Sequence, residues 1–137
     1  MSVDTSRVRQ SIAVRQDRTR ALKSGKLIDV SAEAVQAGFR YPVAITRTAW
    51  LECVAWSSEK AKAAAPEQNE AARLRDLLYT ARAAASRPMQ YAHCVFSLHC
   101  IPQEGAETGT RRMVLVMQIN RNDKGAPVVT ILVPGED

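Results

Sequence analysis

The chain has 137 residues, 46% hydrophobic and 24% charged, a composition typical of one globular domain and not of a low-complexity or collagen-like chain. No apolar run approaches the roughly 20 residues of a membrane-spanning helix, and the three cysteines are an odd number without CxxC spacing. We therefore expect a cytoplasmic protein with reduced thiols and neither a disulfide framework nor a structural zinc site.

The positive charge is concentrated at the N-terminus. Residues 1–26 hold seven of the 19 basic residues and two of the 14 acidic ones, so the twelve of each sign that remain in residues 27–137 cancel, and the net charge of +5 lies in the tail. Few large apolar side chains lie in this tail, so it can bury little surface. We expect a loosely attached helix or an arm that ends near Ser24-Gly25.

The body of the chain, residues 27–137, begins with a predicted short strand, Leu27–Val30. Ser31 is a candidate N-cap for a short helix through Ala37, which Gly38 would close in the left-handed conformation. The next segment, Phe39–Ile45, is aromatic and β-branched, but it contains a proline without an N–H. We therefore expect an edge strand or an extended link there.

Two helices are predicted in the middle of the chain. Thr46 can cap a helix that runs through Trp56 with one apolar side. Residues 57–66 lose that apolar side and are predicted to be a fraying helix end and a connection. The clearest helix extends from Glu67 to about Ser86, because its leucines and alanines recur every three or four residues.

The spacing of apolar side chains then changes from about 3.6 residues to about 2, which is typical of half-buried strands. Residues 92–100, 113–119 and 128–133 are the predicted strands, joined by short turns. Strands joined by short turns form an antiparallel meander. The sequence thus predicts an α+β domain over residues 27–137, in which an antiparallel C-terminal sheet of three or slightly more strands packs against two or three N-terminal helices.

The predicted sheet has a second face that is also partly apolar. We place Val114, Val116, Val129, Ile131 and Val133 on that face. Either another element covers it or it is a contact surface.

Residues with catalytic potential are few. His93 and His99 share one strand face about 20 Å apart, too far to hold a common metal or proton. Either could act alone as a general base with Asp29 or Asp76, although no nucleophile motif or glycine-rich phosphate loop accompanies them. We expect surface histidines, no catalytic residues, no metal site and no cofactor.

The cysteines and tryptophans favour structural roles. Cys94 and Cys100 alternate with apolar side chains, which is typical of inert buried thiols. Trp50 and Trp56 are predicted core residues, and an exposed one would instead be an interface anchor or a base-stacking platform.

The basic tail is the feature that most requires a partner, because clustered cations suit phosphate or an acidic protein surface. A solvated, dispensable extension is the alternative. The candidate binding residues for nucleic acid or an acidic partner are Arg7, Arg9, Arg15, Arg18, Arg20, Lys23 and Lys26, with Arg111 and Arg112 on the second predicted strand of the meander.

Three blocks of the body carry a resemblance: Leu27–Ser31 with Ala37–Arg47 and Trp50, then Arg73–Leu78, then Gly125–Ile131 with Pro134–Asp137. They resemble a family of short bacterial proteins of unknown function that are common on plasmids and other mobile elements. Residues 122–127 depart from it, since a longer glycine-rich turn ending in Gly-Glu-Pro is expected there. The resemblance implies a genomic setting and no activity, and it leaves the basic tail outside the shared region.

These observations lead to a functional hypothesis with two rivals. We expect a non-enzymatic accessory protein of a mobile element that binds nucleic acid or a host protein–nucleic acid complex through the tail and one sheet face, with inhibition of a host defence system as one such role. The rivals are a small enzyme that uses a strand histidine with a carboxylate, and a structural domain that forms a homodimer through Val114, Val116, Val129 and Ile131.

Overall fold

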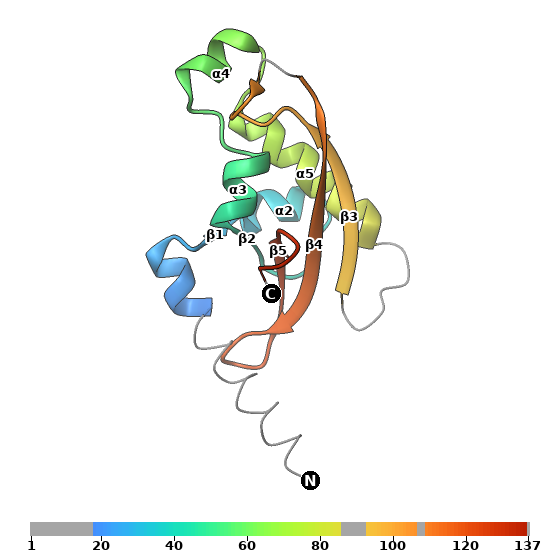
Figure 1. Ribbon diagram of the computed structural model, residues 1–137. Coiled ribbons are helices and arrows are strands. Elements are labelled where there is room, and N and C mark those ends of the chain that lie inside the picture. Colours follow the sequence, from blue (N-terminus) through green and yellow to red (C-terminus); the bar gives the residue numbers. More distant parts are fainter. Residues whose placement is uncertain (1–17, 86–92, 107–108, 137) are drawn as a thin grey trace.

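The computed structural model describes residues 18–85, 93–106 and 109–136 (Figure 1). The strands are β1 (Leu27–Asp29), β2 (Val43–Thr46), β3 (His93–Cys100), β4 (Arg111–Arg121) and β5 (Pro127–Leu132). The helices are α2 (Ser31–Gln36), α3 (Arg47–Cys53), α4 (Glu59–Ala64) and α5 (Glu70–Ala85), preceded by helical residues 18–24. Together they form an α+β fold, as predicted, and none of these helices has the length and apolarity that a membrane crossing requires.

The sheet has five strands in the order β1-β2-β5-β4-β3. The predicted meander is confirmed, because β4 pairs antiparallel with both β3 and β5. The sheet is nevertheless larger than three strands and mixed, since β2 pairs parallel with β5 and β1 pairs antiparallel with β2. The parallel pair joins segments on either side of α3, α4 and α5, a long-range contact that the spacing of neighbouring strands does not reveal.

The prediction that Phe39–Ile45 lies at a sheet edge is wrong. Its strand residues form β2, which lies between β1 and β5. Pro42 immediately precedes the strand, so its missing N–H falls outside the ladder, while its carbonyl accepts a hydrogen bond from the Val129 N–H at 2.8 Å.

One face of the sheet, the helix face, is covered by α2, α3 and α5. The core between sheet and helices includes Ile45, Leu74, Leu77, Leu78, Phe96, Leu98, Leu115, Met117, Val129 and Ile131. The placement of Val129 and Ile131 on the second face is therefore wrong. Residues 128–132 of β5 are apolar on both sides of the alternation, so the pattern could not fix which face was inward.

Capping side chains begin α3 and α4, whereas α2 begins after Val30 without a side-chain cap, so the predicted Ser31 cap is wrong. Thr46 caps α3 as predicted, its Oγ1 accepting from the Ala49 N–H at 3.2 Å. The predicted connection over residues 57–66 instead contains α4, where Ser58 takes the N-cap position. Gly38 has a φ of +101°, which confirms the left-handed end of α2.

Candidate functional site

The second face of the sheet, opposite the helix face, carries a row of polar side chains. Alternation along β2, β4 and β5 directs Thr46, Gln118, Asn120 and Thr130 to this face. Gln118 lies directly opposite Thr130 in the β4–β5 pair. Amide and hydroxyl groups therefore form a hydrogen-bonding floor on this part of the sheet.

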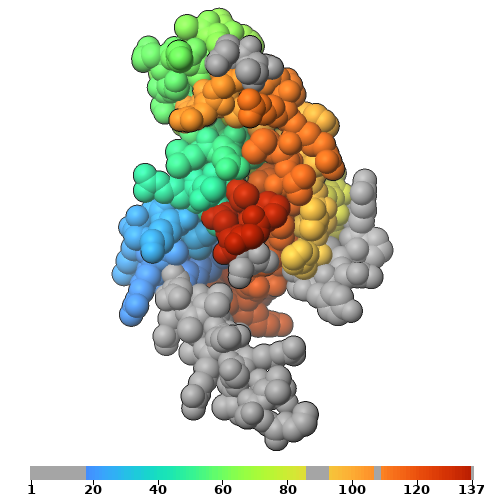
Figure 2. Space-filling view, in the orientation of Figure 1, coloured from blue at the N-terminus to red at the C-terminus, as the bar shows by residue number. Residues whose placement is uncertain are grey.

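A cleft of about 900 Å³ lies over this floor, and we call it the basic cleft. Its lining residues are Arg18, Ala21, Lys26, Leu27, Thr46, Arg47, Thr48, Leu51, Gln118, Asn120, Arg121, Thr130, Leu132 and Glu136. Four of these side chains are cationic and one is a carboxylate. Figure 2 shows the C-terminal turn on the surface between residues 18–24 and β4, two of the regions that contribute to the lining.

Arg18 fastens the start of the described chain to the sheet. Its Nη1 donates to Thr130 Oγ1 at 2.5 Å and its Nη2 to the Val129 carbonyl at 3.1 Å. Burial lowers the pKa of this guanidinium and the charge of Asp29 opposes that shift, but an arginine stays protonated at physiological pH. Residues 18–24 are thus a helix attached to β5, and the helix ends at Ser24-Gly25 as predicted.

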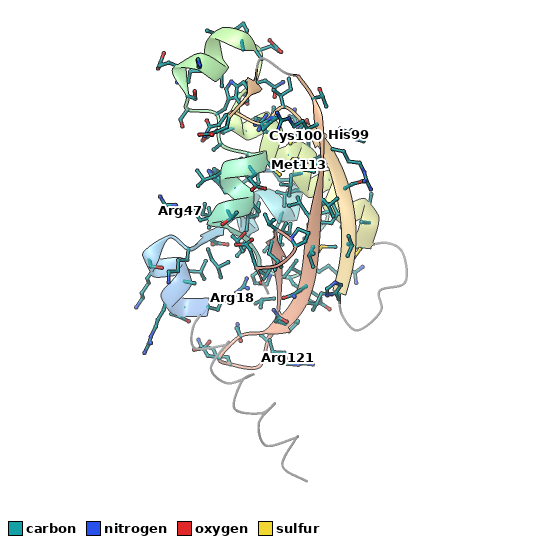
Figure 3. All side chains as sticks on the ribbon, viewed as in Figure 1. Arg18, Arg47, His99, Cys100, Met113 and Arg121 are labelled. Carbon is teal, nitrogen blue, oxygen red and sulfur yellow. The ribbon has the colours of Figure 1, made fainter. Side chains whose placement is uncertain are left out.

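The other three cations are Lys26, in the bend before β1, and one residue each from α3 and β4. Arg47 begins α3 beside Lys26, because the Arg47 N–H donates to the Lys26 carbonyl at 2.8 Å. Arg121 ends β4, and its Nη1 donates to the Gly125 carbonyl in the following turn at 2.8 Å. All three side chains are exposed. Figure 3 shows Arg47 near the middle of the molecule with Arg18 and Arg121 below it, all three below Cys100 and His99.

Glu136 closes the cleft from the C-terminal side. Its Oε1 accepts from Thr46 Oγ1 at 2.8 Å and from the Val133 N–H at 2.7 Å. The only carboxylate in the lining is therefore held by neutral donors. It leaves the field of the cleft dominated by cations.

The structure brings some of the predicted binding residues together and separates others. Arg7, Arg9 and Arg15 lie outside the described residues. Arg18 and Lys26 line the cleft, and Arg20 and Lys23 are exposed on the helix between them. Arg111 and Arg112 are exposed at the opposite end of β4, about 30 Å of strand from Arg121.

Sequence reasoning missed two of the four cleft cations, Arg47 and Arg121. Both belong to a body whose formal charges sum to zero, so the charge count gave no signal. The register of β4 and β5 would not have found Arg121 either, because Arg121 shares the strand phase of the core residues Met117 and Ile119 and reaches the cleft only at the end of β4.

The histidines do not form a site with each other. His93 and His99 lie at opposite ends of β3, and His99 is exposed. Asp29 lies on β1 at the other edge of the sheet, where its Oδ1 accepts from the Ser31 N–H and hydroxyl. His99 and Asp76 do line one small cavity, but both side chains are exposed to water. Among the described residues, no group of three or more His, Cys, Asp or Glu side chains could hold a metal.

The surface proposed for self-association is mostly interior. Val129 and Ile131 lie in the core, and Val116 is 4% exposed. Val114, at 37% exposed, is the one member of that set at the surface. The four residues therefore do not form a common contact surface.

A second cluster joins α3, α5 and the end of β3. Arg73 is 5% exposed and lies over the Trp56 ring, 4.6 Å from its centroid. The hydrogen bond from the Cys53 thiol and the nearby Arg73 charge, against burial, lower the pKa of Cys100 to about 7, and the same hydrogen bond raises that of Cys53. The surroundings of Cys100 are therefore not the purely apolar ones that the alternation predicted, because the Arg73 charge lies nearby. The prediction of a core position is confirmed for Trp56, whereas Trp50 is only half-buried.

Comparison with known proteins gives one match. No curated protein and no solved structure matches the chain. A family of unknown function, DUF6573, matches residues 10–137. The shared region therefore begins inside the basic tail, whereas the resemblance implied that it begins after the tail. The chain belongs to the DUF6573 family.

Proposed function

We propose that this protein binds nucleic acid through the basic cleft and acts as a non-enzymatic accessory protein. The observation that carries the proposal is the set of four cations, from four separate parts of the chain, around one carboxylate and a polar floor. Phosphate backbones bind such cations with release of condensed counterions. The amide of Asn120 can donate to sugar or base oxygens beside the phosphates.

A single strand suits the cleft better than a duplex. Three of the cations are exposed, Arg18 lies against Thr130 on the floor, and the floor is part of a twisted sheet. A flexible strand can bend into such a site, whereas a duplex presents a stiff, convex backbone. Leu51, 48% exposed at the rim, offers apolar contact to a sugar or base. We therefore expect sequence-tolerant binding of single-stranded DNA or RNA.

The proposed setting is a mobile genetic element. Support comes from the three blocks that resemble proteins common on plasmids. A protein with this cleft could engage a host protein–nucleic acid complex by binding the exposed nucleic-acid strand of that complex. Inhibition of a host defence system is one role that this chemistry permits. Identification of the nucleic acid retained from a host lysate, with and without nuclease, tests this wider setting.

Fluorescence anisotropy tests the binding proposal. Labelled oligonucleotides of mixed sequence, single-stranded and duplex, are titrated at low salt with the wild type and with an Arg47→Ala/Arg121→Ala variant. We expect the variant to bind the single strand about 30- to 100-fold more weakly, because each lost charge-assisted contact is worth about tenfold. The matched control is Arg75→Ala, an exposed arginine on α5 at the helix-covered side.

Two outcomes would contradict the proposal. A loss for Arg75→Ala that is as large per charge removed as that of the double variant would mean that net charge alone drives binding. Equal affinity for duplex and single strand would contradict the single-strand preference. Tighter binding of the single strand, lost only in the cleft variant, supports it.

A further inference from the structure

Arg73 is a buried cation in an unusual setting. Its Nε donates to the Val54 carbonyl at 2.9 Å, and its Nη1 donates to the Ile101 carbonyl at 2.7 Å and to Gln68 Oε1 at 3.0 Å. These acceptors are all neutral. Its Nη2 is buried and has no hydrogen-bond partner among the described residues. A buried guanidinium in such a setting favours a neighbouring group that can become an anion.

Two thiols lie beside this guanidinium. Cys53 ends α3 and is 0% exposed, whereas Cys100 ends β3 and is half-buried. Both are free and line the same cavity as Arg73. Cys53 and Cys100 are hydrogen-bonded neighbours, and the half-buried Cys100 beside the Arg73 charge is better placed to carry a negative charge than the fully buried Cys53. The arrangement is a nucleophilic thiolate with a second thiol in reach.

We propose that Cys100 is a peroxide-reactive cysteine and that Cys53 is its resolving partner, so that oxidation joins α3 to β3 through a Cys53–Cys100 disulfide. The co-reactant is hydrogen peroxide or a small organic hydroperoxide. This inference does not rest on nucleic-acid binding.

The chemistry proceeds in two steps. In the first, the Cys100 thiolate attacks one peroxide oxygen, an S–O bond forms, and the O–O bond breaks. The leaving hydroxide or alkoxide takes a proton from water, and the sulfur, oxidised by two electrons, is a sulfenic acid. In the second, the Cys53 sulfur attacks Cys100, the S–S bond forms, the S–O bond breaks, and the departing hydroxide takes the Cys53 proton as water.

The cavity gives the oxidant access. Its volume is about 150 Å³, and the exposed side chains of His99, Asp76 and Thr110 lie at its edge. Because one water occupies about 30 Å³ in the liquid, a small hydroperoxide fits beside Cys100. Bulky oxidants are expected to react more slowly.

Cys94 is an internal control. It lies on the same strand, six residues and about 20 Å from Cys100, too far to pair with it. Its thiol lies 3.8 Å from the Ala84 carbonyl, on the α5 side of the sheet. If peroxide oxidises Cys100 in preference to Cys94, the preference therefore comes from the Arg73 charge beside Cys100 and not from the general exposure of thiols.

The test is mass spectrometry after brief exposure to equimolar hydrogen peroxide. In the wild type and in Cys94→Ser we expect a Cys53–Cys100 disulfide. In Cys53→Ala we expect a sulfenic acid on Cys100 that a cyclic diketone captures. In Cys100→Ser we expect neither product, and circular dichroism confirms that each variant is folded. Preferential oxidation of Cys94, or equal oxidation of Cys53 with and without Cys100, would overturn the proposal.

The pH dependence of disulfide formation in Cys94→Ser is a second measurement that needs no substitution in the core. With a pKa of about 7, Cys100 is half ionised at neutral pH, against about 3% for an ordinary thiol with a pKa of about 8.5. Because a lower pKa also reduces nucleophilicity, the net gain is about three- to fourfold. A rate midpoint near pH 7 supports the proposal, and a midpoint at the ordinary cysteine value contradicts it.

Discussion

The two faces of the sheet are formed by the same strands but differ in what their side chains do. On the helix face, side chains such as Leu115 and Ile131 are completely buried against α5 and its neighbours. On the second face, Gln118, Asn120 and Thr130 are only partly buried and lie under a cleft with four cations. The comparison teaches that core and cleft side chains alternate along β4, so Gln118 and Asn120 can be changed without removing a core side chain, although Val116 on the same face is buried.

The largest effect is expected on the helix face. Leu115→Ala removes a fully buried side chain and should lower the free energy of unfolding by about 3–5 kcal/mol. Asn120→Ala on the same strand changes a partly buried polar group and should cost less than about 1 kcal/mol. Urea denaturation of both variants measures the difference, and similar losses would show that the second face also carries the fold.

Thr46 connects the two faces and should give an intermediate effect. Its Oγ1 caps α3 and also donates to Glu136. Thr46→Ala should cost about 1–2 kcal/mol of unfolding free energy, while Thr46→Ser keeps the hydroxyl and should cost much less. Thermal unfolding compares them. If Ser were as damaging as Ala, the methyl group and not the hydrogen bonds would be the stabilising part.

The pH dependence of stability should reveal the Cys100 thiolate. Its pKa is about 7 in the folded chain, below the unfolded value of about 8.5. A depressed pKa contributes stability that is present above the unfolded value and is lost as pH falls through the folded one. After a discount for partial exposure, wild type should gain about 1 kcal/mol over Cys100→Ser between pH 7 and about pH 8.5. A constant difference in urea denaturation would contradict the thiolate.

Glu136 should give the smallest effect and affect binding more than folding. Glu136→Gln keeps an oxygen that can accept from Thr46 and Val133 but removes the negative charge from the cleft. We expect about threefold tighter binding of single-stranded DNA at low salt and a change in stability below about 0.5 kcal/mol. Weaker binding in anisotropy titrations would mean that the carboxylate itself contacts the nucleic acid.

Local signals in the sequence predicted much of the helix face. The leucine spacing of α5, the alternation in β3 and β4, the Thr46 cap and the turn at Gly38 all lie within a few residues of the structure they specify. The sequence did not show which side chains of β5 face the helices, because apolar residues stand at both alternating sets of positions: Val128, Val129, Ile131 and Leu132. The parallel β2–β5 pair was missed because it depends on a contact across most of the chain.

The candidate sites were harder to predict than the fold. Arg18 and Lys26 belonged to an obvious charge cluster, but Arg47 and Arg121 join them only after the chain has folded. The Arg73 cluster assembles residues from three separate elements, and none of them belongs to a short motif. Spatial convergence of single residues leaves no periodic trace in the sequence.

The salt dependence of single-strand binding tests the central claim most directly. Each phosphate contact contributes about 0.7 to the slope of log K against log salt concentration. The basic cleft therefore predicts that Arg47→Ala/Arg121→Ala lowers the magnitude of that slope by about 1.4, while Arg75→Ala leaves it unchanged. Equal slopes for the wild type and the cleft variant would contradict a role for the cleft in nucleic-acid binding.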